Sequence, residues 1–178
     1  TLLISHIISC ILVGIIFRNW KKNIIRSSKF SKKEENRKQV SIRDLGEILG
    51  NSIKKSISTI LNIGGFVVIF SVIISILNSS GVLNIVGNFC SYINIPKEIG
   101  NSIFSGLIEL TNGVKSISLI PCSNLIICIT SFLIGFGGIS VLLQVYSIIC
   151  KNNISIKPYF YGKLLQGFIS FFITSIII

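Results

Sequence analysis

The sequence of 178 residues contains no methionine, one histidine, three prolines and only six acidic residues. Charged residues make up 13% of the chain, well below the roughly 25% that is usual in soluble domains, so the composition excludes an ordinary soluble globular domain. One histidine and five cysteines without a C-x-x-C pair give little support to a zinc site. We therefore expect neither a metal nor a cofactor.

The chain begins with Thr1 and has no initiator methionine. We therefore expect it to be the C-terminal part of a longer protein, whose missing N-terminal half supplies a share of any binding site. Residues 1–17 lack a basic leading region and a small-residue cleavage site. We interpret them as the end of a transmembrane span and not as a signal peptide.

Long apolar runs are what the sequence does contain. Half of its residues are hydrophobic, and the mean hydropathy is +0.79. Several windows approach the roughly 20 residues that cross a bilayer as a helix, which predicts an all-α integral membrane protein, a polytopic helical bundle with broken or re-entrant helices. Within a membrane domain at 44–178 we expect an amphipathic helix at 41–58, spans at about 59–77, 121–149 and 158–178, and a segment at 82–119 that is either two short crossings or a re-entrant hairpin.

Positive charge is concentrated in residues 18–43, which contain 10 of the 17 lysines and arginines. A basic segment can bind nucleic acid, but this one lies between two apolar spans, so the positive-inside rule predicts a cytoplasmic loop. We expect the lipid bilayer as a partner and no nucleic acid. Trp20 and the PYFYGK stretch at 158–163 fit interfacial anchors.

Glu109 is the residue whose position most needs a functional explanation. It lies among leucines and isoleucines, and an ionisable side chain in the membrane interior costs about 2.5–3.5 kcal/mol on insertion scales and usually marks a pathway or site. The alternative is a shallow position near the interface, bonded to a neighbouring serine or to Lys115. On a continuous helix one narrow face carries the small and polar residues of this segment, which are Ser102, Ser105, Gly106, Glu109, Asn112 and Gly113.

Other apolar segments carry stripes of small and hydroxylated residues. We expect most of these to serve helix packing, with substrate contact as the alternative. Glycines at 64–65, 113 and 135–138 can each open a helix, and transporters use interrupted helices whose free backbone groups point at the ligand. We favour a break at 135–138, the alternative being a close approach of two helices. The stripe residues are Gly64, Ser71, Ser75 and Asn78, then Thr130, Gly137, Ser140, Gln144 and Ser147, and finally Lys163, Gly167, Ser170 and Thr174.

An amphipathic basic helix is followed in order by GGFVVIFSVIISIL, GLIELTNG, SFLIGFGGISVLLQV and ISIKPYFYGKLLQGFIS. In this order the stretches resemble the YlbJ family of sporulation integral membrane proteins, which belongs with the nucleoside-recognition or Gate-domain membrane proteins. The resemblance covers nearly the whole chain. It implies a multi-pass protein of the bacterial cell membrane, located in the mother-cell-derived outer forespore membrane, that helps to move dipicolinic acid. By the same resemblance the two halves of the gate are Glu109, Thr111, Asn112 and Gly113 on one side, and Gly135, Gly137, Gly138, Ser140 and Gln144 on the other.

We therefore expect a transporter component for a small organic anion, coupled to a proton or a cation. An ionised Glu109 would repel such a substrate, so Glu109 should be protonated or occupied by a cation when the substrate is bound. Lys115, or the N–H groups freed at the Asn112–Gly113 pair, are the candidate charge partners of the substrate. The alternatives are a membrane scaffold or assembly factor, and a nucleoside or ion carrier gate. No His, Asp or Cys constellation accompanies Glu109, so we do not expect an enzyme.

Overall fold

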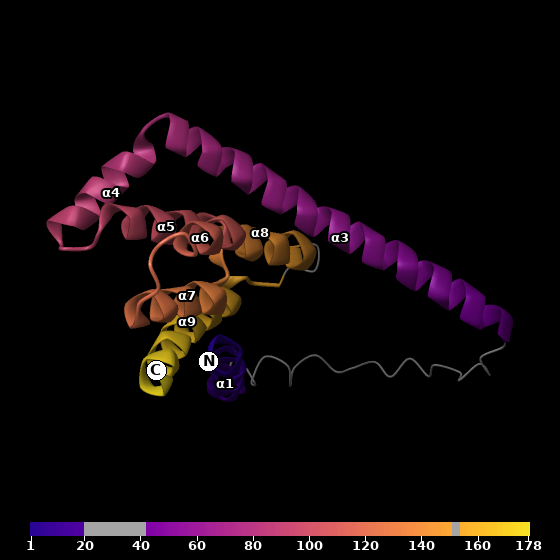
Figure 1. Cartoon of the computed structure of the whole chain (residues 1–178). Coiled ribbons are helices and arrows are strands. Elements are labelled where there is room, and N and C mark those ends of the chain that lie inside the picture. Colours follow the sequence, from indigo (N-terminus) through magenta and orange to yellow (C-terminus); the bar gives the residue numbers. More distant parts are fainter. Residues whose placement is uncertain (20–41, 151–153) are drawn as a thin grey trace.

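The computed structural model describes residues 1–19, 42–150 and 154–178, and the side chains of the second range from residue 45 onward. In these residues the regular structure is helical and contains no strand, as the sequence predicts. Most of the basic segment 18–43, including Trp20, lies outside the described residues. The helices, shown in Figure 1, are α1 (Leu2–Phe17), α3 (Ile42–Ser79), α4 (Val82–Tyr92), α5 (Lys97–Ile108), α6 (Leu110–Ile117), α7 (Asn124–Phe136), α8 (Gly138–Ile149) and α9 (Lys157–Ile177).

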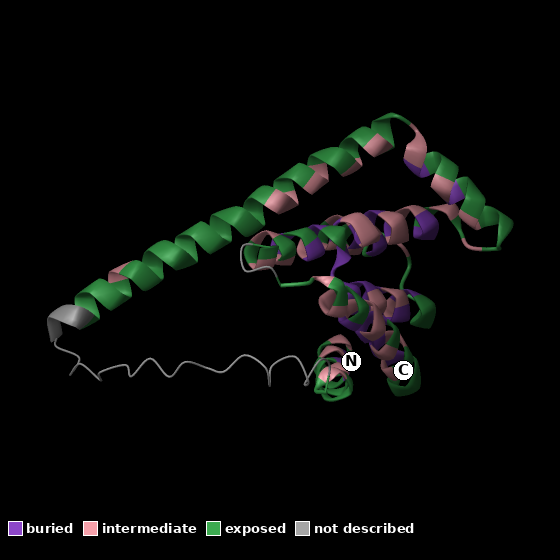
Figure 2. Cartoon of the chain, turned by 180° about the vertical axis from the view of Figure 1, so that it is seen from behind, coloured by how far each residue is buried: buried purple, intermediate pink, exposed green. Residues whose placement is uncertain are grey.

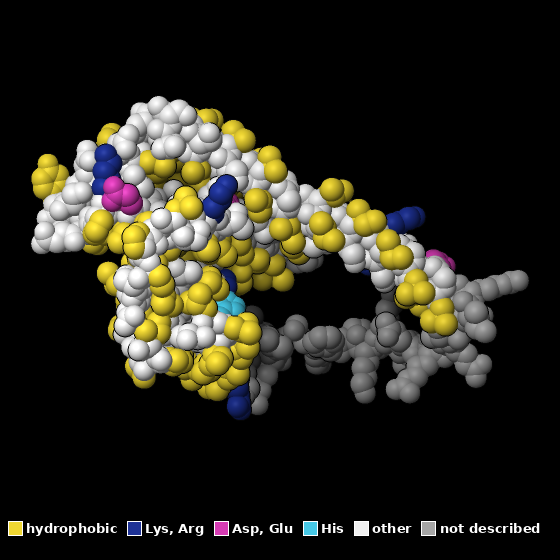
Figure 3. All heavy atoms as spheres, in the orientation of Figure 1, with side chains coloured by type: hydrophobic (Ala, Val, Ile, Leu, Met, Phe, Trp, Pro, Cys, Tyr) yellow, Lys and Arg dark blue, Asp and Glu magenta, His cyan; other side chains and the backbone are white. Residues whose placement is uncertain are grey.

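Three helical stretches of the described residues are long and apolar enough to cross a membrane. They are Leu45–Ser79 in α3, Asn124–Ile149 across α7 and α8, and Lys157–Ile177, which is α9. Hydrophobic side chains cover much of the face in Figure 3, with few charged side chains among them. The structure thus agrees with the prediction of a polytopic helical bundle with broken helices.

The sequence analysis expected two separate elements here, an amphipathic helix at 41–58 and a span at 59–77. In the structure they form one continuous helix of 38 residues, α3. At 1.5 Å per residue this helix is about 57 Å long, against about 30 Å for a hydrocarbon core. Gly64 and Gly65 lie inside it without a break. A glycine costs a helix only about 1 kcal/mol, whereas free backbone groups facing lipid would cost several kcal/mol each, so the helix continues.

Helices α7 and α9 pack closely along each other, and α1 packs against both of them, with the N- and C-terminal ends close together (Figure 1). Four hydroxyls, which we call the hydroxyl cluster, join these helices. Thr174 Oγ1 lies 2.8 Å from Ser5 Oγ and 2.7 Å from Ser131 Oγ, and Ser131 Oγ lies 2.7 Å from Ser170 Oγ. All four side chains are buried, so the polar stripe of the last span serves helix packing at Ser170 and Thr174.

The segment 82–119 contains α4, α5 and α6, which have 11, 12 and 8 residues. Each is shorter than the roughly 20 residues of a crossing, which favours the re-entrant alternative. Helix α4 packs against α5, and α6 folds back onto α5. This last contact depends on two glycines, because a Cβ at Gly113 would collide with the Cα of Gly106. Buried residues concentrate in α5 to α9, whereas α3 is exposed over most of its length (Figure 2).

Candidate functional site

The first feature of the candidate site is the break between α5 and α6 at Glu109. This residue has an extended backbone, with φ −141° and ψ 119°, and forms the N-cap of α6. The break therefore lies at Glu109 and not at the Asn112–Gly113 pair, where the sequence analysis expected an opening; that pair lies inside α6. Gly113 is needed for the close approach to α5.

The Glu109 carboxylate is 2% exposed and accepts four hydrogen bonds. Oε1 accepts from the Thr111 backbone N–H at 3.0 Å, and Oε2 accepts from the Asn112 N–H at 2.8 Å. Oε2 also accepts from Thr111 Oγ1 at 2.6 Å and from Asn112 Nδ2 at 2.9 Å. A carboxylate is favoured at a helix N-terminus because it satisfies free N–H groups and complements the helix dipole. The N–H groups expected to meet a substrate thus bind Glu109 itself.

A polar cavity of about 260 Å³ adjoins this break, between α3, α4, α5 and α6. Asn112 connects the two, because its Nδ2 atom donates to Ser71 Oγ in α3 at 2.7 Å as well as to Glu109. In the described part of the chain, Asn101 Oδ1 is a buried side-chain oxygen without a hydrogen-bond partner. The residues that carry the polar groups of this Ser–Asn cavity are Ser71, Ser75, Asn78, Asn101, Ser102, Ser105, Asn112 and Ser116.

The second feature is the break between α7 and α8 at GFGG, which the sequence analysis favoured. Helix α7 ends at Phe136, and α8 begins at Gly138. Gly137 and Gly138 have φ values of +85° and +81°, in the left-handed region that favours glycine. The break at GFGG is confirmed, but the close helix approach given as its alternative is present as well, at Gly135 and Gly138. Neither glycine lines one of the cavities found among the described residues.

The two breaks lie against each other. A Cβ at Gly138 would be 3.0 Å from the carbonyl oxygen of Gly106 and 3.3 Å from that of Ile108, so the start of α8 touches the last turn of α5. The start of a helix carries free N–H groups and partial positive charge, whereas the end of a helix carries free carbonyls and partial negative charge. The two interrupted helices therefore meet with complementary ends.

The remaining predicted residues divide into three groups. Ser140 and Gln144 are buried on α8, and Gln144 Nε2 donates to Ser140 Oγ at 3.2 Å. Gly135 lies in α7 and faces α9, where a Cβ at Gly135 would be 2.8 Å from the Cα of Gly167. Lys115 is exposed on α6 and does not line the Ser–Asn cavity. The structure therefore places Gly135 in a helix contact and gives Lys115 no contact with Glu109.

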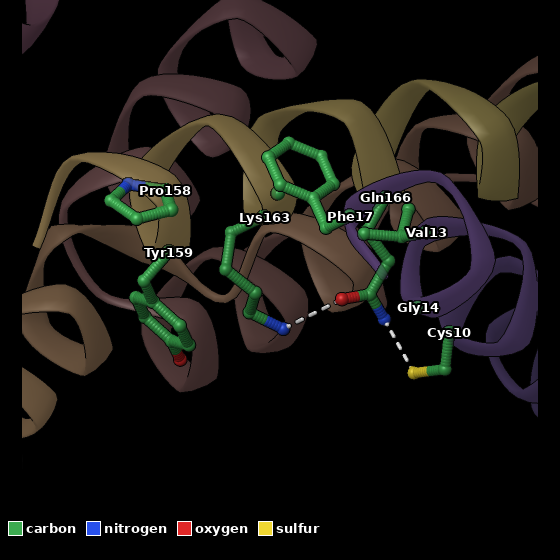
Figure 4. Close-up of a pocket in the computed structure, with 9 residues that line it drawn as sticks. Cys10, Val13, Gly14, Phe17, Pro158, Tyr159, Lys163 and Gln166 are labelled. Carbon is green, nitrogen blue, oxygen red and sulfur yellow. Dashed lines mark hydrogen bonds between the residues drawn. The ribbon is translucent and has the colours of Figure 1, made fainter. Parts of the chain in front are cut away.

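A cleft of about 410 Å³ between α1 and α9, which we call the α1/α9 cleft, was not predicted as a site (Figure 4). Lys163 Nζ donates to Gln166 Oε1 at 3.1 Å, and Gln166 Nε2 donates to Cys10 Sγ at 2.9 Å and lies 3.5 Å from His6 Nδ1. Residues about 160 positions apart meet here, so no local pattern could have indicated it. The available signal was Lys163, which the sequence analysis treated as an interfacial residue and as a member of the polar stripe of the last span. The described residues bring together no group of three potential metal ligands of the His, Cys, Asp and Glu types.

Comparison with curated proteins gives one informative match. The sporulation integral membrane protein YlbJ of Bacillus subtilis (strain 168) is 36% identical to this chain over 130 residues. The chain is a relative of YlbJ. The match covers 70% of this chain and 32% of YlbJ, so the chain spans about a third of the length of its relative. No protein-family model matches, and no solved structure matches significantly.

The match to YlbJ supports two of the expectations from the sequence. It supports the YlbJ family, and together with the apolar helices it supports a location in a membrane. The relationship to Gate-domain proteins, the outer forespore membrane and the movement of dipicolinic acid stay predictions.

Proposed function

We propose that this chain is part of a sporulation membrane transporter that moves a small organic anion, with dipicolinic acid as the candidate, across the outer forespore membrane. The observation that carries the proposal is the contact between two interrupted helices beside the buried Glu109. Membrane transporters bind substrates and coupling ions where helices are interrupted, because the free backbone groups there can bind a ligand. This relative is named as a sporulation integral membrane protein, which supports the biological setting.

Glu109 and the substrate would compete for the same donors. The N-terminus of α6 suits a carboxylate, and in the structure that carboxylate belongs to Glu109. A substrate carboxylate can accept from the Thr111 and Asn112 N–H groups only after Glu109 has left them. Protonation of Glu109 weakens its hold because a neutral carboxyl group is a poorer acceptor than a carboxylate. Uptake of the anion would then be coupled to a proton on Glu109, in a protein that performs no chemical reaction.

A neutral nucleoside-like ligand is a second candidate, favoured by the lining of the Ser–Asn cavity. This lining contains hydroxyl and amide groups and no charged side chain. A dianion would have no cation to meet there, whereas a neutral ligand could exchange hydrogen bonds with these hydroxyl and amide groups. A membrane scaffold is the third candidate, because the hydroxyl cluster shows that part of the polar stripes serves helix packing.

Uptake by the full-length natural protein in proteoliposomes separates these candidates. We expect uptake of radiolabelled dipicolinate by the wild-type protein and none by Gly138→Leu, whose side chain would push into α5. Gly65→Leu is the matched control, since nothing lies within 4 Å of the Cβ position on the exposed face of α3. Uptake of a nucleoside instead of dipicolinate would favour the neutral ligand. Absence of both, with unchanged spore dipicolinate in a deletion strain, would favour the scaffold.

A further inference from the structure

In the part of the chain that the structure describes, the α1/α9 cleft contains a cation and no acidic residue lines it. Every residue that lines this cleft belongs to the described part of the chain, and Lys163 is the charged residue of that lining. An ammonium carries three N–H donors, and the structure pairs one of these, with Gln166 Oε1. Gln166 is 5% exposed, so the Lys163 ammonium contacts a buried amide (Figure 4). A cation in such surroundings is costly unless an anion accompanies it.

The rest of the lining suits an apolar body attached to that anion. Phe17 and Tyr159 contribute aromatic rings, and Val13 contributes an aliphatic side chain. A volume of about 410 Å³ lies within the range of roughly 300–1,000 Å³ that is usual for small-molecule sites. Sites of this kind combine a mostly apolar wall with a few polar groups that orient the ligand.

The cleft also lies next to the second helix break. A Cβ at Gly137 would be 3.6 Å from the Lys163 Cε atom, so the stem of this lysine passes beside the end of α7. A ligand held by Lys163 would therefore bind close to the point where α7 and α8 separate. Lys115, the charge partner expected from the sequence, is exposed on α6 instead.

We propose that the α1/α9 cleft binds a small organic anion with an apolar body, whose anionic group is held by the Lys163 ammonium. Gln166 positions this ammonium, because it is fixed in turn by Cys10 and lies near His6. The choice of a free organic anion as ligand rests on the proposed function. The phosphate of an anionic lipid offers the same combination of charge and apolar body, so the experiment must separate the two sources.

Binding of radiolabelled dipicolinate to the full chain in nanodiscs tests the site. The nanodiscs contain phosphatidylcholine alone or phosphatidylcholine with phosphatidylglycerol. Lys163→Met should weaken binding about tenfold or more, because it removes a charge-assisted hydrogen bond, whereas Lys163→Arg should retain binding. Lys54→Met, at an exposed lysine of α3, is the matched control and should bind as the wild type does. The neutral diamide of dipicolinate should bind weakly to every form.

A second measurement needs no variant. Cys10 lines the cleft and is exposed, and Cys122 is exposed outside it. Dipicolinate should slow alkylation of Cys10 by N-ethylmaleimide and leave alkylation of Cys122 unchanged. Equal protection of both cysteines, or of neither in a protein that binds dipicolinate, would overturn the assignment of the site.

The outcomes separate this inference from the proposed function. If the wild type and Lys163→Met bind dipicolinate equally, the cleft is not the site, but the protein still binds the anion. If the wild type ignores dipicolinate but retains phosphatidylglycerol that Lys163→Met loses, the cleft is an anion site for lipid phosphate and the proposed function fails. If neither ligand binds, both the inference and the proposed function fail.

Discussion

Asn112 joins the first helix break to α3, because its Nδ2 atom lies 2.7 Å from Ser71 Oγ and 2.9 Å from Glu109 Oε2. One amide group thus contacts the long exposed helix and the buried carboxylate at once. A second polar contact of α3 lies further along the helix, where Asn62 Nδ2 donates to Ser147 Oγ of α8 at 3.3 Å. Side-chain hydrogen bonds thus join α3 to α6 through Asn112 and to α8 through Asn62.

Replacement of Asn112 should cost more stability than replacement of its partner. Asn112→Ala removes a hydrogen bond to a carboxylate and one to a hydroxyl, which we expect to lower the free energy of unfolding by about 2–3 kcal/mol. Ser71→Ala removes one neutral bond and should cost about 1 kcal/mol. Thermal unfolding in detergent measures both. Ser75→Ala, which lines the same cavity on α3, is the control and should have little effect; equal effects of all three would contradict the role given to Asn112.

The hydroxyl cluster should contribute a modest amount to the docking of α1. Thr174→Val keeps the side-chain shape and removes the hydroxyl that lies between Ser5 and Ser131. Hydrogen bonds between membrane helices average about 0.6 kcal/mol, so we expect a loss of about 1 kcal/mol in an unfolding titration. Thr130→Val is a matched control, because the Thr130 hydroxyl bonds to the Ile126 carbonyl of its own helix. A larger loss for Thr130→Val would refute the interhelical role.

Composition and periodicity were sufficient for the class of protein and for one of the two breaks. Apolar runs indicated a helical membrane protein, and the glycines at 135–138 indicated a break. The structure shows why, since Gly137 and Gly138 both adopt φ values that other residues avoid. The break at Glu109 escaped the analysis, since glutamate is not among the usual N-cap residues. The position of this break is set by a long-range contact, because α6 folds back onto α5 so that Gly113 packs against Gly106.

Two further features could not be predicted from local sequence patterns. They are the continuity of α3 and the presence of the α1/α9 cleft. A change from an amphipathic to an apolar sequence near residue 59 suggests a turn, but the backbone gains more from staying helical. The cleft depends on Gln166 meeting Cys10 and His6, residues far away in sequence. Such pairings are specified by tertiary structure alone.

Gly138 should be much less tolerant of substitution than Gly137. Both have positive φ, so asparagine, which tolerates this region, costs both sites a similar amount of backbone energy. At Gly137 the nearest atoms to a Cβ are 3.6 Å away, whereas at Gly138 a backbone carbonyl lies at 3.0 Å. We expect Gly137→Asn to fold and transport, and Gly138→Asn to lose uptake in proteoliposomes. Normal uptake by both variants would show that the contact between the breaks is not needed.

Glu109 should determine how uptake depends on pH. If a proton must release Glu109 from the N-terminus of α6 before the anion can bind there, uptake by the wild type rises as pH falls. Glu109→Gln cannot exchange a proton, so its uptake should be independent of pH. The side-chain amide of this glutamine would also place an N–H group opposite the backbone N–H of Thr111 or of Asn112. Because two donors would then face each other, we expect the variant to lose about 1 kcal/mol in stability.

Two further variants at this position separate charge from shape. Glu109→Asp keeps the carboxylate and is itself a good N-cap, so it should retain the pH dependence with reduced uptake. Glu109→Lys puts a cation against the positive end of α6 and should abolish both stable insertion and uptake. Uptake of dipicolinate into proteoliposomes, measured against external pH at equal protein content, compares all four forms. If the wild type and Glu109→Gln give the same pH profile, Glu109 does not carry the coupling proton. The hypothesis that the substrate replaces Glu109 at the N-terminus of α6 is then wrong.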